Sequence, residues 1–181
     1  MSINPELVVK AMNESMCPEV ISWVDNRITH FHWTGNTFVY PPVLSEFKSH
    51  TANIQSDRSI NAFGLRDLKN DRLVGYFEIG SIDMDNRSGR LGRFLMDPSM
   101  RGQGLGQVAM RVIENQFFGN ELLHRFELLV ATDNLPAIAC YQKVGFQTEG
   151  ILRESRRFGN EWRAVQIMGL LRHEWEEEAG K

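Results

Sequence analysis

The middle of the chain alternates between apolar and polar positions. This alternation covers residues 60–66, 73–82 and 89–96, and it is typical of strands with one buried face. Turn-forming residues separate these segments at 68–71 (LKND) and 85–89 (DNRSG). The pattern predicts three consecutive antiparallel strands.

After residue 96 the apolar spacing becomes helical. A 3.6-residue period links Leu105, Val108, Ala109, Val112, Ile113 and Phe117. The apolar segment 126–131 follows and is typical of a buried strand. A strand, a glycine-containing turn, a helix and a second strand form a crossover, which makes the two strands parallel.

A second, shorter helix is predicted from about Leu135 to Val144. Asn134 occupies its N-cap position, Pro136 lies in its first turn, and Gly145 stands where a glycine commonly ends a helix. Further strands are predicted at 146–149 and 165–171.

The two ends of the chain give weaker patterns. Helices are predicted at 18–27 and 43–53, and the segment 31–42 (FHWTGNTFVYPP) between them combines aromatic residues with turn formers. The terminal segment 173–181 (HEWEEEAGK) is expected to be a solvated tail. Together the patterns predict a mixed α/β (α+β) fold in a single domain, residues 1–181, with a mostly antiparallel sheet, one parallel crossover and flanking helices.

Composition narrows the possible partners. The 181 residues carry a net charge of -3, which supplies no basic field for nucleic acid. Only Cys17 and Cys140 are present, and there is no leader-like segment or 18-residue apolar run. We therefore expect a cytoplasmic protein that binds neither nucleic acid nor membrane. His30 and His32 lack a third ligand nearby, so no metal is expected.

The turn before the long helix is unusually rich in glycine. Gly102, Gly104 and Gly106 alternate in the segment 96–107 (MDPSMRGQGLGQ). Glycines at a helix N-terminus allow an anion to approach free N–H groups, so the turn predicts a phosphate or diphosphate site. The spacing fits neither GxxxxGK[ST] nor GxGxxG. The alternative is a turn that needs positive φ angles and binds nothing.

Two segments resemble motifs of the GNAT N-acetyltransferase superfamily. Residues 101–106 (RGQGLG) are similar to its [Q/R]-x-x-G-x-[G/A] motif, and residues 134–146 (NLPAIACYQKVGF) are similar to N-x-x-A-x-x-x-Y-x-K-x-G-F. The resemblance covers residues 89–150. Within the superfamily, the N-terminal helices and the GILRE sequence at 150–154 are similar to the RimJ/RimL-like branch.

The resemblance implies a GNAT fold and acetyl transfer from acetyl-CoA, the cosubstrate, to a primary amine. The expected acceptor is a protein N-terminal α-amine. The alternatives are a small amine, such as a polyamine or an aminoglycoside, and a CoA-binding sensor without turnover. A monomer or homodimer is expected.

The resemblance also assigns the cofactor-binding residues. Main-chain groups of Phe94, Leu95 and Met96 would pair with pantetheine, and Asn134 would lie beside it. The diphosphate would bind the backbone of Arg101, Gly102, Gln103, Gly104, Leu105 and Gly106. Lys143 or Arg111 is predicted to bind the 3′-phosphate of CoA.

The resemblance makes Tyr141 the acid that protonates the leaving thiolate. The alternative is a packed tyrosine. Members of the family carry a catalytic glutamate at one of two places, where this chain has Leu129 and Arg90. Glu78 is the expected replacement, and the alternative is a strand carboxylate that only faces solvent. The weaker candidates for the base are Glu127, Asp83, His30 and His32.

The missing glutamates bear on the acceptor. Deprotonating a lysine amine at pH 7 costs roughly 4.6 kcal/mol, but an α-amine costs only about 1.4 kcal/mol. A site without a strong base therefore favours a peptide N-terminus or another low-pKa amine, or else a water chain that leads to a remote carboxylate.

Overall fold

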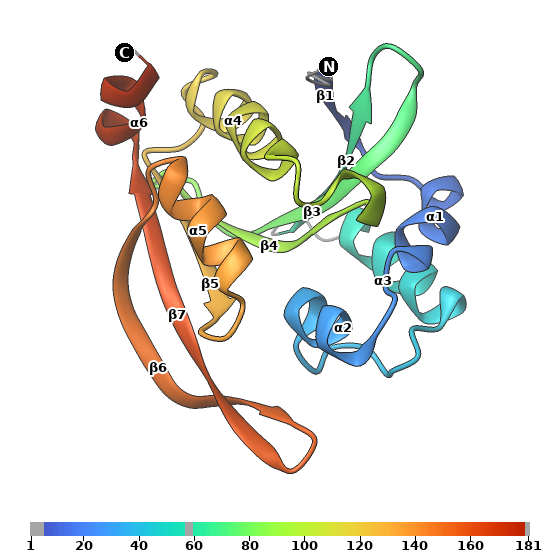
Figure 1. The fold of residues 1–181 in the computed structure, drawn as a ribbon. Coiled ribbons are helices and arrows are strands. Elements are labelled where there is room, and N and C mark those ends of the chain that lie inside the picture. Colours follow the sequence, from blue (N-terminus) through green and yellow to red (C-terminus); the bar gives the residue numbers. More distant parts are fainter. Residues whose placement is uncertain (1–5, 57–59, 180–181) are drawn as a thin grey trace.

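One twisted sheet runs through the molecule (Figure 1). The computed structural model describes residues 6–56 and 60–179. Within them, seven strands pair in the order β1-β2-β3-β4-β5-β7-β6. The strands are β1 (Leu7–Ala11), β2 (Asn61–Asp67), β3 (Arg72–Asp83), β4 (Ser88–Met96), β5 (Arg125–Ala131), β6 (Gln147–Phe158) and β7 (Glu161–Leu171). The helices are α1 (Cys17–Ser22), α2 (Arg27–Thr34), α3 (Leu44–Ser56), α4 (Leu105–Phe118), α5 (Leu135–Lys143) and α6 (Arg172–Ala179). Two 3-10 turns are η1 (Glu14–Met16) and η2 (Pro98–Met100).

The predicted three-strand unit and the crossover are both confirmed. β2, β3 and β4 pair antiparallel through the two predicted turns. β4 and β5 are parallel and are joined by α4. The remaining pairs are antiparallel, so the sheet is mostly antiparallel with one parallel pair.

Two groups of helices cover opposite faces of the sheet. Apolar residues of α4 and α5, such as Ile113 and Tyr141, pack in one core with Phe77 and Phe126 of the sheet. Residues of α1, α2 and α3 form a second core against the other face of β2, β3 and β4. Burial of these faces is the main force that holds the helices on the sheet.

β4 and β5 separate after a short pairing. Their register runs only from Ser88 opposite Arg125 to Leu91 opposite Leu128. Just beyond it, the β3–β4 register shifts, and Arg93 adopts a φ of 45°. A bulge of this kind bends its strand away from its neighbour. The end of β4 and the end of β5 therefore face each other across a gap in the sheet.

The structure differs from the sequence expectations near both ends of the chain. β1 had not been predicted. α2 begins at Arg27 and includes the first four residues of the segment expected to be turn-rich. β6 and β7 extend well beyond the predicted ranges 146–149 and 165–171.

In the part of the chain that the structure describes, no helix is long and apolar enough to cross a membrane.

The expectation of a solvated tail is wrong for residues 173–179. They belong to α6, whose Trp175 lies 5.6 Å from the Phe118 ring, measured between centroids. Trp175 packs against the core, and an aromatic pair of this kind adds about 0.5–1.5 kcal/mol to the effect of surface burial. Residues 180–181 lie outside the described part.

Candidate active site

A cavity of about 1150 Å³ occupies the gap between β4 and β5. Its walls come from the ends of these two strands, from α2, from the glycine loop before α4, and from α5. A volume of this size suits a long cofactor together with a small second molecule.

The glycine loop forms one end of the cavity. Gly102 and Gly104 adopt φ angles of 72° and 77°, which favour glycine. A Cβ atom on either would meet nothing within 4 Å, so open space lies beside the loop. Gly106 lies in the first turn of α4, where a Cβ would approach Cys140 Sγ at 3.3 Å.

The backbone of this loop presents free donors. Arg101 N donates to Pro98 O and Gln107 N to Gly104 O, whereas no described residue accepts from the N–H groups of 102–106. Such groups at the start of a 14-residue helix form an anion site, because the helix dipole adds a partial positive charge. The Arg101 N–H, which was expected to join the site, is therefore already bonded, and the diphosphate site at 102–106 stays a prediction.

The side chains of this loop support its shape. Arg101 donates from Nε to Met96 O and from Nη2 to Trp23 O, both at 3.1 Å. Gln103 Nε2 donates to Ser99 O at 2.8 Å. Gln103 and the buried Leu105 do not line the cavity, whereas Gly102, Gly104 and Gly106 do.

The two residues predicted to bind the 3′-phosphate of CoA differ in their position relative to the cavity. Lys143, in the last turn of α5, lines the cavity. Arg111 faces Glu114 and Glu178 instead, at 3.5 and 3.7 Å, and does not line the cavity. The geometry therefore favours Lys143.

The residues predicted to hold pantetheine also line the cavity. Phe94, Leu95 and Met96 lie on the part of β4 that has lost its β5 partner. Asn134 stands at the N-cap position of α5, but its side chain makes no capping hydrogen bond. Asn134 is one of the residues that line the cavity.

Tyr141 lines the same cavity from α5. Its side chain is buried, and its ring lies 6.5 Å from Phe94 and 6.0 Å from Phe146. Its hydroxyl bonds to no described residue, in contrast to the Tyr76 hydroxyl, which donates to Glu78. Burial, aided by neighbouring Cys140, raises the pKa of Tyr141 well above its ordinary value, so the phenol is protonated at neutral pH.

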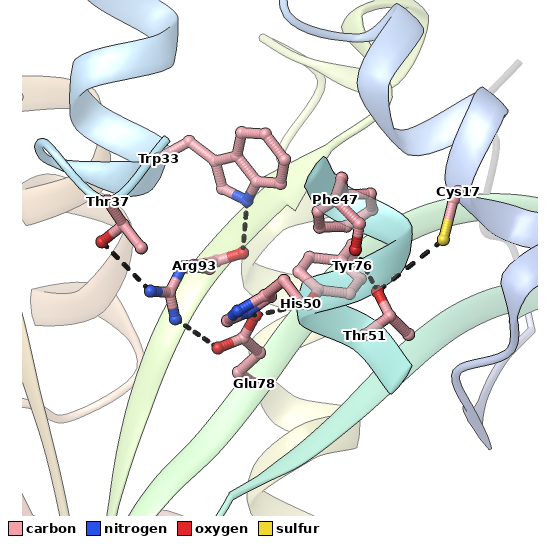
Figure 2. Close-up of polar contacts among 9 residues, drawn as sticks. All are labelled: Cys17, Trp33, Thr37, Phe47, His50, Thr51, Tyr76, Glu78 and Arg93. Atoms are coloured by element: carbon pink, nitrogen blue, oxygen red, sulfur yellow. Dashed lines mark hydrogen bonds and ion pairs between the residues drawn. The ribbon is translucent and has the colours of Figure 1, made fainter. Parts of the chain in front are cut away.

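Glu78 lies behind the cavity wall and does not line it. Figure 2 shows its carboxylate at the centre of a polar cluster. One oxygen accepts from Tyr76 and pairs with His50 Nε2 at 2.8 Å, and the other accepts from Arg93. Burial alone would raise the pKa of Glu78, but these three partners outweigh burial and lower it.

Arg93 is a site residue that the sequence analysis missed. Its guanidinium lines the cavity between Glu78 and Thr37, and its carbonyl accepts from Trp33 Nε1 at 3.0 Å (Figure 2). The bulge that places it is a tertiary feature, because a positive φ at an arginine leaves no mark in a single sequence.

His32 lines the cavity from α2 and pairs with a carboxylate. Its Nε2 lies 3.0 Å from Asp133 Oδ1, just before the start of α5. A separation of 101 residues hides this pair from any local pattern. Its orientation by a carboxylate makes His32 a second candidate for the base. His30, by contrast, is buried in a smaller cavity beside Tyr40.

The remaining candidates for the base, Glu127 and Asp83, do not line the cavity. Glu127 is bonded by Arg90, and Asp83 caps the turn at Asn86. Among residues 6–56 and 60–179, no three His, Cys, Asp or Glu side chains are grouped to hold a metal ion.

Sequence comparison links the chain to acetyltransferases. The profile of the Acetyltransferase (GNAT) family matches residues 26–146. A probable N-acetyltransferase, YjcK of Bacillus subtilis (strain 168), is 28% identical over 109 residues, which is 60% of each chain. A spermine/spermidine N(1)-acetyltransferase of the same strain is 34% identical over 85 residues, covering 44% of this chain and 56% of the relative. Both matches span less than two thirds of the relative.

Structure comparison gives a longer match. The crystal structure of a spermidine N-acetyltransferase from Vibrio cholerae in complex with CoA and spermine superposes with a TM-score of 0.82. The match covers 94% of this chain and 98% of that chain, at 21% sequence identity. At this identity the likeness shows a shared fold.

Proposed function

Because the chain belongs to the Acetyltransferase (GNAT) family, we propose that it transfers the acetyl group of acetyl-CoA to the primary amine of a small molecule. The free backbone donors of residues 102–106, beside open space, are the observation that carries the proposal. They would hold the diphosphate of CoA. The unpaired ends of β4 and β5 would then take the pantetheine arm and bring the thioester toward Tyr141.

The proposed reaction is a direct attack. The amine nitrogen adds to the thioester carbonyl, the carbon–sulfur bond breaks, and the sulfur accepts a proton or hydrogen bond from Tyr141. The amine loses a proton to a base. No covalent intermediate on the enzyme is needed. Cys140 is not suited to form one, because burial, aided by the nearby Glu114 charge, raises the pKa of its thiol to about 11.

A small-molecule acceptor is preferred to the protein N-terminus. Relatives at 34% identity over 85 residues and at 22% over 173 residues are named as polyamine acetyltransferases. The RimJ/RimL-like branch and its protein acceptor stay predictions, as does a CoA-binding module without turnover.

The test is release of free CoA thiol from acetyl-CoA with a panel of small amines and an N-terminal peptide. We expect turnover with at least one small amine and a measurable heat of CoA binding by calorimetry. CoA binding without thiol release for any amine would favour the sensor. No heat of binding with CoA or acetyl-CoA would contradict both proposals.

Glu78 stays the predicted base, acting through water because it does not line the cavity. In that role, Glu78→Gln is expected to lower kcat by about tenfold or more, since the amide cannot accept a proton. The measurement is thiol release with saturating acetyl-CoA, together with the heat of CoA binding to show that the site is intact.

Glu127→Gln is the matched control for this prediction. Glu127 also pairs with a cavity-lining arginine, Arg90, at 2.5 Å, and the change removes the same charge. An unchanged kcat for folded Glu78→Gln would rule out the role. If kcat falls in His32→Gln instead, His32 would be assigned as the base.

A further inference from the structure

The charge of the cavity wall does not suit a polycation. None of the described residues that line the cavity is Asp or Glu. The basic residues on the lining are Arg90, Arg93, Arg101, Lys143 and Arg156. Arg101 and Lys143 belong to the end expected to bind CoA, whereas the other three come from β4 and β6. A polyamine in this cavity would meet arginines and find no carboxylate on the wall.

Two of these three arginines already have a carboxylate partner. Arg90 donates from Nε and Nη2 to Glu127 Oε1 at 2.8 and 2.5 Å, and Arg93 donates to Glu78. These carboxylates lie outside the cavity lining. Because each is held by an arginine, neither is free to bind a cationic acceptor.

Arg156 differs from the other two. It forms no ion pair with a described residue, and its Nη1 bonds only to Ser155 O and Oγ, at 3.0 and 3.3 Å. Its register partner across the β6–β7 hairpin is Arg163, which does have carboxylate partners in Asp133 and Glu161. Like charges directly opposite each other on paired strands are unfavourable. Arg156 is an exposed residue, and no described carboxylate pairs with its charge.

The fold holds Arg156 at the cavity. Its Cδ and Nε lie 3.9 Å from the position of a Cβ on Gly35, which follows the last turn of α2. Two further contacts join the hairpin to the end of α2. Asn36 donates to Arg157 O at 2.7 Å, and the Phe31 and Phe158 rings lie 4.8 Å apart. Figure 1 shows the hairpin extending past β5 beside α2.

We infer that the acceptor carries an anionic oxygen group, a carboxylate or a phosphate, in addition to its amine, and that Arg156 binds this group. The inference rests on the proposed function and names its substrate class. A guanidinium matches either group through two parallel N–H···O bonds. Bound there, the anion compensates the charge of Arg156, and the cavity directs the amine end toward the thioester. Arg156 is then a specificity residue, with no part in the chemical step.

The first test compares matched acceptors by kcat/KM for thiol release. One pair compares γ-aminobutyrate, which carries a carboxylate, with its amide. The other pair compares phosphoethanolamine, which carries a phosphate, with ethanolamine. Spermidine represents the polycations. At least one anionic acceptor is expected to exceed its neutral counterpart by about tenfold or more, as one charged contact allows. The two pairs also separate a carboxylate from a phosphate as the preferred group.

The outcomes separate the two proposals. The inference is overturned if kcat/KM is highest for spermidine, or if it is equal for the anionic and neutral acceptors. Either result leaves the proposed function standing. The absence of thiol release with every acceptor contradicts the proposed function itself.

The second test uses variants of the hairpin. Arg156→Ala is expected to raise the KM for the anionic acceptor about tenfold. Both kcat and the KM for acetyl-CoA are expected to stay unchanged. Arg156→Glu is expected to shift the preference toward spermidine. Arg157→Ala is the matched control, because Arg157 is exposed, donates to Gly159 O at 3.0 Å, and does not line the cavity.

Two results would refute the role of Arg156. One is an unchanged KM for the anionic acceptor in Arg156→Ala. The other is a raised KM for acetyl-CoA in the same variant, which would assign Arg156 to the phosphates of CoA.

Discussion

Tyr141→Phe is expected to lower kcat by about 10- to 100-fold and to leave the KM for acetyl-CoA nearly unchanged. The change removes only the hydroxyl, which bonds to no described residue and lies on the cavity wall. The packing of the ring against Phe94 and Phe146 is retained, so the variant should fold. Thiol release at saturating acetyl-CoA measures the effect.

A control variant and the pH dependence of activity provide two further tests of the role of Tyr141. Tyr40→Phe removes a hydroxyl from a half-exposed tyrosine outside the main cavity and should leave kcat unchanged. Burial raises the pKa of Tyr141 well above its ordinary value, so ionisation of this phenol should cause no loss of wild-type activity near pH 10. A kcat for Tyr141→Phe equal to wild type would leave Tyr141 with a packing role only.

Glu114→Gln is expected to stabilise the protein above neutral pH. Glu114 lies on α4 with no exposed surface, and its oxygens have no hydrogen-bond partner among the described residues. Arg111 Nη1 lies 3.5 Å away. Burial outweighs this arginine and raises the pKa of Glu114 from its ordinary 4.5 to about 8.

The direction of the pH effect follows from proton binding. Between pH 4.5 and about 8, the folded protein holds a proton on Glu114 that the unfolded chain has released. The wild-type free energy of unfolding therefore falls as pH rises through this range. At pH 8 to 9 the Gln variant should be more stable than wild type by roughly 4 to 5 kcal/mol, and near pH 4 the two proteins should have similar stability.

Urea unfolding at several pH values measures this difference. Glu177→Gln is the control, because Glu177 is exposed on α6 and the change removes the same charge. Equal pH slopes for wild type and Glu114→Gln would show that Glu114 is ionised in the folded protein.

Local patterns predicted the centre of the fold because its elements follow simple periods. The alternating segments became β2, β3 and β4, and the helical spacing from Leu105 became α4. Gly145 ends α5 with a φ of 103°, as a helix-terminal glycine should. The glycine loop was predicted from the same local patterns, whereas Tyr141 was identified as a site residue through the resemblance of residues 134–146 to the GNAT motif.

The missed elements are fixed by contacts between distant segments. α2 is rich in β-branched and aromatic residues, which are poor helix formers, although Asn26 caps it by accepting from Thr29 N at 2.9 Å. β6 is exposed along most of its length, so no alternation marks it. Arg93 and Arg156 reach the cavity through a bulge and a long hairpin, and neither feature has a local signal in one sequence.

The gap between β4 and β5 leaves two strand edges without partners inside the sheet. An unpaired edge normally invites another chain to add a strand, and aggregation can follow. Here the two edges face each other across the cavity, and α2 and α5 flank them. The protein can therefore keep open backbone groups for a ligand while denying them to a neighbouring molecule.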